Sequence, residues 1–300
     1  MAASKDNIKE LALGLGMSVC GIAGADRFDE CPPGRHPRDI LPGCKSAIVI
    51  GVKLLDGVVQ TNFRAFEDGR RDLKGIYGTY GYSIIPNFEL TYACYAIAKY
   101  IEQNTDEFAT PCSTGPMTNG MQISIRHAAV AAGLGLLGWS GLMMTPEFGA
   151  RGRYGVILTT LDLEQDTLYD GPPICDPEKC GICAKKCPTG ALSKYGEEPN
   201  YQFTISGRKF EYCKINTNKC QLATLAMMKK HGGQDDYITT DDPTGEEIFE
   251  AVAKMPISPA GLQHQSAHNC GICLTYCPAA NWGKRSSESG LSKGPSAIRK

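Results

Sequence analysis

Two separated cysteine blocks carry the clearest chemistry in this chain of 300 residues. Each block combines a Cys-x2-Cys pair with a third cysteine that follows after three more residues and precedes a proline. This spacing is the ligand pattern of bacterial [4Fe-4S] proteins, in which the last cysteine of one block ligates the cluster of the other. We therefore predict two [4Fe-4S] clusters and one-electron transfer. The blocks read Cys175-x4-Cys180-x2-Cys183-x3-Cys187-Pro188 and Cys270-x2-Cys273-x3-Cys277-Pro278.

The simplest ligand assignment exchanges the last cysteines of the two blocks and adds Cys220 as an eighth ligand. Cys220 is preferred over Cys213 because residues 218–222 open a predicted helix. Zinc is the alternative metal, since Cys-x2-Cys pairs also build zinc ribbons. Two observations argue against zinc: each block has a third cysteine followed by proline, and the candidate ligands number eight. The two predicted ligand sets are Cys175, Cys180, Cys183 with Cys277, and Cys220, Cys270, Cys273 with Cys187.

Composition and charge restrict the possible partners. A formal net charge of −1 and a hydrophobic fraction of 42% describe a globular chain, and they give no electrostatic reason to expect a nucleic acid or a membrane. The N-terminal residues show neither a signal-peptide pattern nor a twin-arginine pair, so we expect a cytoplasmic protein with cysteines free for metal. Residues 127–144 approach the length of a membrane span, but glycines interrupt them; we predict a helix that ends in a buried glycine-rich loop.

The hydrophobic patterns predict an α/β (α+β) domain over residues 1–171 and a second domain over 172–282 that holds all the cluster ligands. Pro172-Pro173 marks the boundary, and residues 283–300 are predicted to be a flexible tail because they are rich in Ser, Gly, Lys and Arg. The predicted strands are 18–25, 47–52 and 154–161, and the predicted helices are 4–16, 87–103, 220–230 and 246–255.

The second informative feature is the segment of small residues from Ile125 to Gly141. Small residues let a backbone approach a flat cofactor closely, and tight helix packing is the alternative explanation. No Gly-Lys-Ser/Thr follows, which excludes a phosphate-binding loop. Gly133 and Gly135 follow a predicted helix rather than a strand, which argues against a dinucleotide-binding fingerprint.

Taken together, these features resemble the superfamily of epoxyqueuosine reductases and reductive dehalogenases. The resemblance covers most of residues 5–282 and rests on several specific segments. Besides both cysteine blocks and Cys220, the matching segments are Leu41-Pro42-Gly43-Cys44-Lys45-Ser46-Ala47-Ile48-Val49-Ile50-Gly51, Arg126-His127-Ala128-Ala129 running into Ala132-Gly133-Leu134-Gly135 and Gly138-Trp139, Thr145-Pro146-Glu147-Phe148-Gly149, and Leu158-Thr159-Thr160.

The resemblance implies a nitroreductase-like domain that binds a base-off corrinoid (cobalamin), followed by a ferredoxin-like two-cluster module. Electrons would pass through the clusters to cobalt, which would reduce a small organic substrate; the protein would position the cofactor and supply a proton. We expect a reduced ferredoxin- or flavodoxin-type electron donor. The predicted corrinoid-binding residues are Arg126, His127, Gly133, Gly135, Gly138 and Trp139.

Two of these residues have alternative explanations. Arg126 is equally explained as a helix-start salt bridge. His127 is predicted to be packed and hydrogen-bonded rather than a cobalt ligand, because the family keeps its corrinoid base-off without a protein histidine.

The chain departs from the family at the proton donor. Epoxyqueuosine reductases carry an acidic residue three positions before a proline ahead of the glycine-rich stretch, and here Ser113 stands before Pro116. A neutral serine is a poor general acid. Reductive dehalogenases use a tyrosine, and Tyr80 and Tyr82 lie in a predicted loop before the long helix; ordinary surface or core aromatics are the alternative. The candidate catalytic residues are therefore Tyr80, Tyr82 and Ser113.

The expected substrate also differs from that of the epoxyqueuosine reductases. Those enzymes have a C-terminal helical-repeat extension suited to tRNA, and this sequence ends soon after its second cysteine block. We therefore expect an iron–sulfur oxidoreductase that acts on a small organic molecule. The alternatives are an electron-transfer protein without a corrinoid and an epoxyqueuosine (tRNA) reductase.

Overall fold

The computed structural model describes residues 3–82, 84–112, 123–197, 200–233, 235–255, 270–280 and 282. The candidate residue Ser113 and the predicted tail at 283–300 lie outside this part of the chain.

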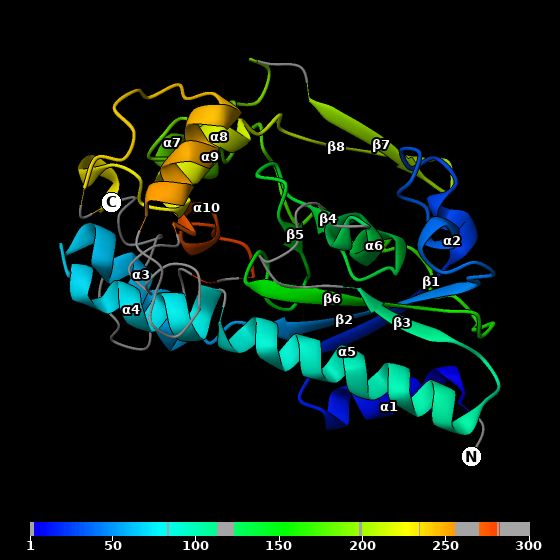
Figure 1. Cartoon of the computed structure of the whole chain (residues 1–300). Coiled ribbons are helices and arrows are strands. Elements are labelled where there is room, and N and C mark those ends of the chain that lie inside the picture. Colours follow the sequence, from blue (N-terminus) through cyan, green and yellow to red (C-terminus); the bar gives the residue numbers. More distant parts are fainter. Residues whose placement is uncertain are drawn as a thin grey trace.

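A four-stranded antiparallel sheet with the order β1-β2-β6-β3 forms the centre of the molecule (Figure 1). In its register, Ile48 pairs with Ile22 on one side and with Ile157 on the other. The strands predicted at 18–25, 47–52 and 154–161 are confirmed. The strand bounds are β1 (Val19–Gly24), β2 (Ser46–Lys53), β3 (Ala109–Cys112) and β6 (Gly152–Thr159).

Helices cover both faces of this sheet. On one face lie α1 (Lys5–Gly14) and α5 (Ile85–Asn104), which pack against Ile48 and Ile50. On the other face lies α6 (Ile125–Ala131), which packs against Val49 of the same strand. Because alternate residues of a strand point to opposite faces, a strand buried on both sides reads as a continuous apolar run.

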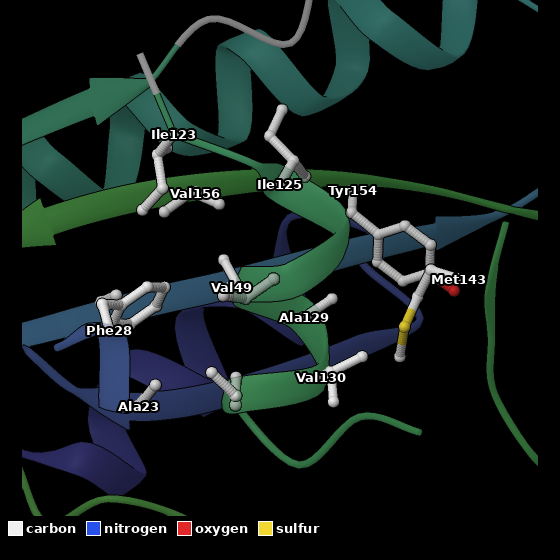
Figure 2. Packing of buried hydrophobic residues seen from close by; sticks show 14 of the residues in the cluster. Ala23, Phe28, Val49, Ile123, Ile125, Ala129, Val130, Met143, Tyr154 and Val156 are labelled. Carbon is white, nitrogen blue, oxygen red and sulfur yellow. The ribbon is translucent and has the colours of Figure 1, made fainter. Parts of the chain in front are cut away.

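Small side chains bring α6 close to the sheet. Figure 2 shows Ala129 and Val130 of this helix beside Ala23 and Val49 of the strands. Helix α6 ends at Ala131, and the chain continues through the short strands β4 (Leu136–Leu137) and β5 (Met143–Met144). The predicted helix with a buried glycine-rich loop is thus confirmed. No helix in the described ranges is both long and apolar enough to span a membrane.

A β-hairpin from the second half of the chain covers the other side of α6. Its strands, β7 (Tyr201–Ile205) and β8 (Arg208–Tyr212), pair with Phe203 opposite Phe210. Ile205 and Tyr212 join the hydrophobic core that α6 shares with the sheet. In Figure 1, α6 therefore lies between the sheet and this hairpin, with the short helix α2 (Pro37–Ile40) nearby.

The cysteine blocks lie at the opposite end of the molecule, beside α3 and α4 (Figure 1). Phe63 of α3 packs against Ile272 and Tyr276 of the second block. The helices of this region are α3 (Asp56–Glu67), α4 (Lys74–Tyr77), a π-helical turn at Gly78–Tyr82, α7 (Ile182–Lys186), α8 (Thr217–Thr224), α9 (Gly245–Lys254) and α10 (Ile272–Thr275).

One predicted helix is shorter than expected. The helix predicted at 220–230 ends at Thr224, and a separate 3-10 turn follows at Lys229–His231. Ala226 between them has a φ of 48°, a left-handed conformation that interrupts an α-helix. The other predicted helices are confirmed. The division at residue 172 stays a prediction, since hydrophobic clusters contain residues from both sides of it.

Candidate metal centres and cofactor cavity

The first group of thiols, which we call group A, consists of Cys175, Cys180, Cys183 and Cys277. These thiols interact electrostatically with one another. Burial, with smaller contributions from the neighbouring Cys175 and Cys277, raises the pKa of Cys183 to about 12. The backbone N–H of Trp139 lies 3.4 Å from the Cys175 sulfur, where it stabilises a thiolate. Group A therefore joins three cysteines of the first block to the last cysteine of the second.

The second group, group B, consists of Cys187, Cys220, Cys270 and Cys273. Burial raises the pKa of Cys270 to about 11, and Cys220 and Cys187 contribute in the same direction. The pKa of Cys273 is raised well above its ordinary value by burial, by its three partners in group B and by Cys183 of group A. Burial of the sulfur also raises the pKa of Cys220, although the residue as a whole is exposed. Cys213, the alternative to Cys220, interacts with Cys187 and with Cys183 of group A.

Groups A and B follow the predicted ligand sets, and contacts also cross between them, since Cys183 acts on Cys273. Sulfur atoms buried together are stable as thiolates only beside positive charge, which a metal supplies. No group of three or more His, Cys, Asp or Glu in the described residues is arranged to hold a single metal ion. A zinc site draws all its sulfurs to about 2.3 Å from one ion, whereas a cubane spreads its four thiolates over four irons. The assignment of the ligands stays a prediction.

Each group lies beside a buried cation. Arg151, which is 2% exposed, donates to the backbone carbonyls of Cys277 (3.0 Å) and Ala279 (2.6 Å) next to group A. Lys74, which is 7% exposed, lies 4.2 Å from the centre of the Phe66 ring and interacts electrostatically with Cys270 of group B. Arg151 also interacts electrostatically with the carboxylate of Asp56. Sequence analysis missed both cations, because nothing in their local sequence indicates burial.

The predicted catalytic tyrosines do not share one environment. Tyr80 is 52% exposed. Tyr82 lies against Arg153, whose guanidinium is 4.6 Å from its ring centre, and burial raises the pKa of Tyr82 to about 12. Tyr82 and the fully buried Tyr77 both interact electrostatically with Cys270 and Cys273. The structure thus places the tyrosine segment beside group B.

A cavity of about 750 Å³ lies between α6, the hairpin β7–β8 and the loop before α2. Aromatic side chains form much of its wall, and cationic side chains from the loop and the hairpin also line it. Its volume lies in the upper part of the range for small-molecule sites, about 300–1,000 Å³. The aromatic lining residues are Phe28, His127, Tyr201, Phe203 and Tyr212, and the cationic ones are Arg27, Arg35 and Lys209.

Of the residues predicted to bind a cofactor, His127 lines this cavity. Its ring meets Phe203 edge-on at 4.3 Å, and its Nδ1 shares a hydrogen bond with Ser124. Burial, with a smaller contribution from Arg126, lowers the pKa of His127 to about 4, so the ring is neutral at neutral pH. His127 is thus packed and hydrogen-bonded, as predicted from the sequence.

The predicted glycines contact the protein's own chain. A Cβ atom on Gly133 would overlap the carbonyl of Thr167, and one on Gly135 would overlap the carbonyl of Met144. A Cβ on Gly138 would overlap the Met144 sulfur. Tight packing of the chain therefore explains why these positions require glycine, as in the alternative explanation of this segment. Contact of these glycines with a cofactor stays a prediction.

Arg126 and Trp139 are likewise engaged within the protein. Arg126 donates to the carbonyl of Gly141 and lies 5.9 Å from the ring centre of Tyr212; its contact with a corrinoid stays a prediction. Trp139, which is 3% exposed, donates to the carbonyl of Ser193 at 2.8 Å. Trp139 packs in one cluster with Cys213 and with cysteines of both groups, between the thiols and the cavity side of β8.

Comparison with known proteins places the chain in a family context. No family model matches it. It is 27% identical over 285 residues to the epoxyqueuosine reductase of Gloeobacter violaceus, covering 90% of this chain and 69% of that protein. It is 27% identical over 163 residues to the tetrachloroethene reductive dehalogenase of Sulfurospirillum multivorans, covering 54% of this chain and 25% of that protein. These similarities support membership of the chain in the superfamily of epoxyqueuosine reductases and reductive dehalogenases.

Solved structures agree with this superfamily fold. A selenomethionine-labelled epoxyqueuosine reductase matches with a TM-score of 0.57 at 19% identity, over 93% of this chain and 66% of that one. An epoxyqueuosine reductase bound to an epoxyqueuosine-modified tRNA stem loop matches with a TM-score of 0.52 at 16% identity, over 90% and 70% of the two chains. The chain thus spans about two thirds of these reductases. The chain has a mixed α/β fold, and its relatives support the assignment of a redox enzyme.

Proposed function

We propose that this protein is an iron–sulfur reductase whose two [4Fe-4S] clusters pass electrons to a corrinoid in the cavity, where a small organic substrate is reduced. The observation that supports the proposal is contact between the blocks: Cys175 and Cys183 of the first interact with Cys277 of the second, and Cys270 and Cys273 of the second interact with Cys187 of the first. This is the ligand exchange of two-cluster ferredoxins. A reduced ferredoxin- or flavodoxin-type protein is the proposed electron donor.

One wall of the cavity connects directly to the thiols along the chain. Tyr212 lines the cavity, and Cys213, which follows it, packs against Trp139 among the cysteines of both groups. Strand β8 and Cys213 thus connect a wall of the cavity to the cysteine cluster, and this connection is the proposed route for electrons.

The residues that line the cavity suit a corrinoid. Phe28, Phe203 and Tyr212 offer apolar walls for a flat macrocycle, and Arg35 and Lys209 offer positive charge for its anionic parts. When bound, a corrinoid supplies a metal that changes oxidation state and cleaves bonds of the substrate reductively. The protein's own residues would orient this group, and the neutral His127 would offer it a hydrogen bond without a charge.

The cavity also changes the candidates for the proton donor. The phenols that line it are Tyr201 and Tyr212, whereas Tyr80 and Tyr82 lie outside its lining residues. Tyr201 is 47% exposed and can exchange protons with solvent. We propose Tyr201 as the donor, with Tyr201→Phe expected to lower turnover more than Tyr80→Phe.

Cofactor content tests this function directly. Protein purified and reconstituted without oxygen should carry about eight irons per chain and bind cobalamin in a one-to-one ratio. Phe203→Ala should weaken cobalamin binding without changing the iron content. Iron without any affinity for cobalamin would contradict the corrinoid half of the proposal.

A two-cluster electron-transfer protein without a corrinoid is the second candidate. Packing of the predicted cofactor-binding glycines against the protein's own chain favours it. Such a protein should reduce an artificial acceptor at the same rate with or without cobalamin. An enzyme of the first kind should show substrate-dependent turnover only when cobalamin is present.

A tRNA substrate is the third candidate, because one of the relatives is an epoxyqueuosine reductase and a solved homologue holds a modified tRNA stem loop. Expression of this chain in a strain that lacks epoxyqueuosine reductase tests it. Restored queuosine in tRNA would replace the small-molecule substrate with tRNA.

A further inference from the structure

The two cysteine blocks contain the same turn in different surroundings. Each block reads Cys-Gly-Ile-Cys, and its glycine has a left-handed backbone, with φ of 58° at Gly181 and 56° at Gly271. A Cβ on Gly181 would meet one atom, the Lys185 Cε at 3.9 Å, whereas a Cβ on Gly271 would overlap the hydroxyl of Tyr77. The second turn is therefore covered by a buried phenol that the first turn lacks.

The phenol of Tyr77 has no hydrogen-bond partner in the described residues, although the side chain is fully buried. Leaving a buried O–H without an acceptor costs about 1–3 kcal/mol, so such groups call for an explanation. Tyr77 belongs to α4 and lies beside Cys270 and Cys273 of group B, with which it interacts electrostatically. The hydroxyl lies against Gly271, in the turn that carries Cys270 and Cys273 and their sulfurs.

We propose that the Tyr77 hydroxyl donates a hydrogen bond to a sulfur of the cluster held by group B and so raises the reduction potential of that cluster. The inference rests on the proposed function only in requiring that both clusters are present. Hydrogen bonds to cluster or ligand sulfur stabilise the more negative, reduced state and shift the potential upward. The two clusters, although held by near-identical turns, are thereby made unequal.

The test is an EPR-monitored reductive titration of the holoprotein and of Tyr77→Phe. In the variant, one of the two midpoint potentials should become more negative while the other stays unchanged. At a fixed solution potential, the reduced-to-oxidised ratio of that cluster should fall about tenfold, which corresponds to about 59 mV for one electron. Two unchanged midpoints in Tyr77→Phe would overturn the inference.

Tyr154 provides a matched control. Its phenol is also buried without a partner in the described part of the chain, but it packs against Gly51 and Gly152 of the sheet. Its electrostatic neighbour is Glu147 rather than a thiol. Tyr154→Phe should leave both midpoints unchanged; a shift equal to that of Tyr77→Phe would show a general effect of phenol removal and overturn the inference.

A second variant covers the case in which Tyr77→Phe loses iron. Replacement of Tyr77 by 3-fluorotyrosine keeps the ring and makes the hydroxyl a stronger donor, so the midpoint of the same cluster should rise. No rise would overturn the inference. Wild-type protein that binds no iron would overturn the proposed function as well, whereas two clusters with unmoved potentials would overturn the role of Tyr77 alone.

Discussion

The phenol of Tyr276 donates a hydrogen bond to the carboxylate of Glu67 in α3, and the Lys186 ammonium lies 3.1 Å from the same carboxylate. Tyr276 precedes Cys277 and Lys186 precedes Cys187. The Glu67 carboxylate therefore binds the residues that directly precede Cys187 and Cys277. The Lys186 ammonium also lies 4.6 Å from the centre of the Tyr276 ring.

Removal of this carboxylate should loosen both Cys-Pro turns. Charge-assisted hydrogen bonds contribute about 1.5–3 kcal/mol, and partial exposure reduces this, so we expect Glu67→Ala to lower the free energy of unfolding by about 1–2 kcal/mol. Chemical denaturation of the anaerobic holoprotein measures it. Glu250→Ala is the control, because Glu250 pairs only with Lys254 on the exposed face of α9. Equal losses in the two variants would contradict the role given to Glu67.

Exchange of ligands between the blocks predicts which cluster each cysteine holds. Cys187→Ala should remove the cluster of group B, about four irons, although Cys187 belongs to the first block. Its remaining EPR signal should match that of Cys270→Ala and differ from that of Cys183→Ala. Cys213→Ala should keep about eight irons, and loss of a cluster there would transfer the role of eighth ligand from Cys220 to Cys213.

Neutral His127 predicts a pH dependence of stability. The pKa of this histidine is about 4 in the folded protein and about 6.5 when unfolded, so the unfolded state binds the extra proton between these values. Stability should therefore fall as the pH drops from about 6.5 to about 4, by roughly 2–3 kcal/mol. Thermal unfolding of His127→Phe across this range should show a shallower fall than wild type. Parallel curves would mean that other groups control the acid transition.

The two left-handed glycines should tolerate substitution unequally. Alanine in a left-handed conformation costs about 1–2 kcal/mol, which applies to both Gly181→Ala and Gly271→Ala. Gly271→Ala must also displace the Tyr77 hydroxyl, so we expect it to be the more destabilising and to lower iron content. Denaturation midpoints and iron analysis of the two variants give the comparison. Equal stabilities would show that Tyr77 moves away freely.

The aromatic wall of the cavity should control ligand binding. Phe203 stacks on Phe210 at 5.1 Å and meets His127, so Phe203→Ala opens the wall on both sides. We expect cobalamin affinity to fall about tenfold, or about 1.4 kcal/mol. Phe249→Ala is the control, since Phe249 is 76% exposed on α9. Calorimetric titration measures both.

Local sequence patterns were sufficient to predict secondary-structure elements and their burial. The apolar run in β2 and the glycine-rich end of α6 predict buried elements, because strand and helix periodicity is encoded locally. The spacing of the cysteines likewise indicated two thiol groups. The metal-ligand pattern of each block lies within a short stretch of sequence.

The cavity could not be predicted in this way. Its walls come from residues near Arg27, from α6 and from β7–β8, which are separated by more than a hundred residues in part. The buried positions of Lys74 and Arg151 depend on packing against the cysteine turns, which leaves no periodic signal. The tyrosine pattern predicts an active-site loop, which stays a prediction, and it gives no sign that Tyr82 lies beside the thiols of group B.

The hairpin β7–β8 occupies the stretch of chain between Cys187 and Cys220, which are both members of group B. Once iron holds these two cysteines together, the hairpin becomes a closed loop with fixed ends, and closing a loop lowers the entropy cost of ordering it. Under the proposed function, installation of the second cluster would therefore favour the ordered hairpin, and cluster assembly would be linked to the shape of the cavity wall.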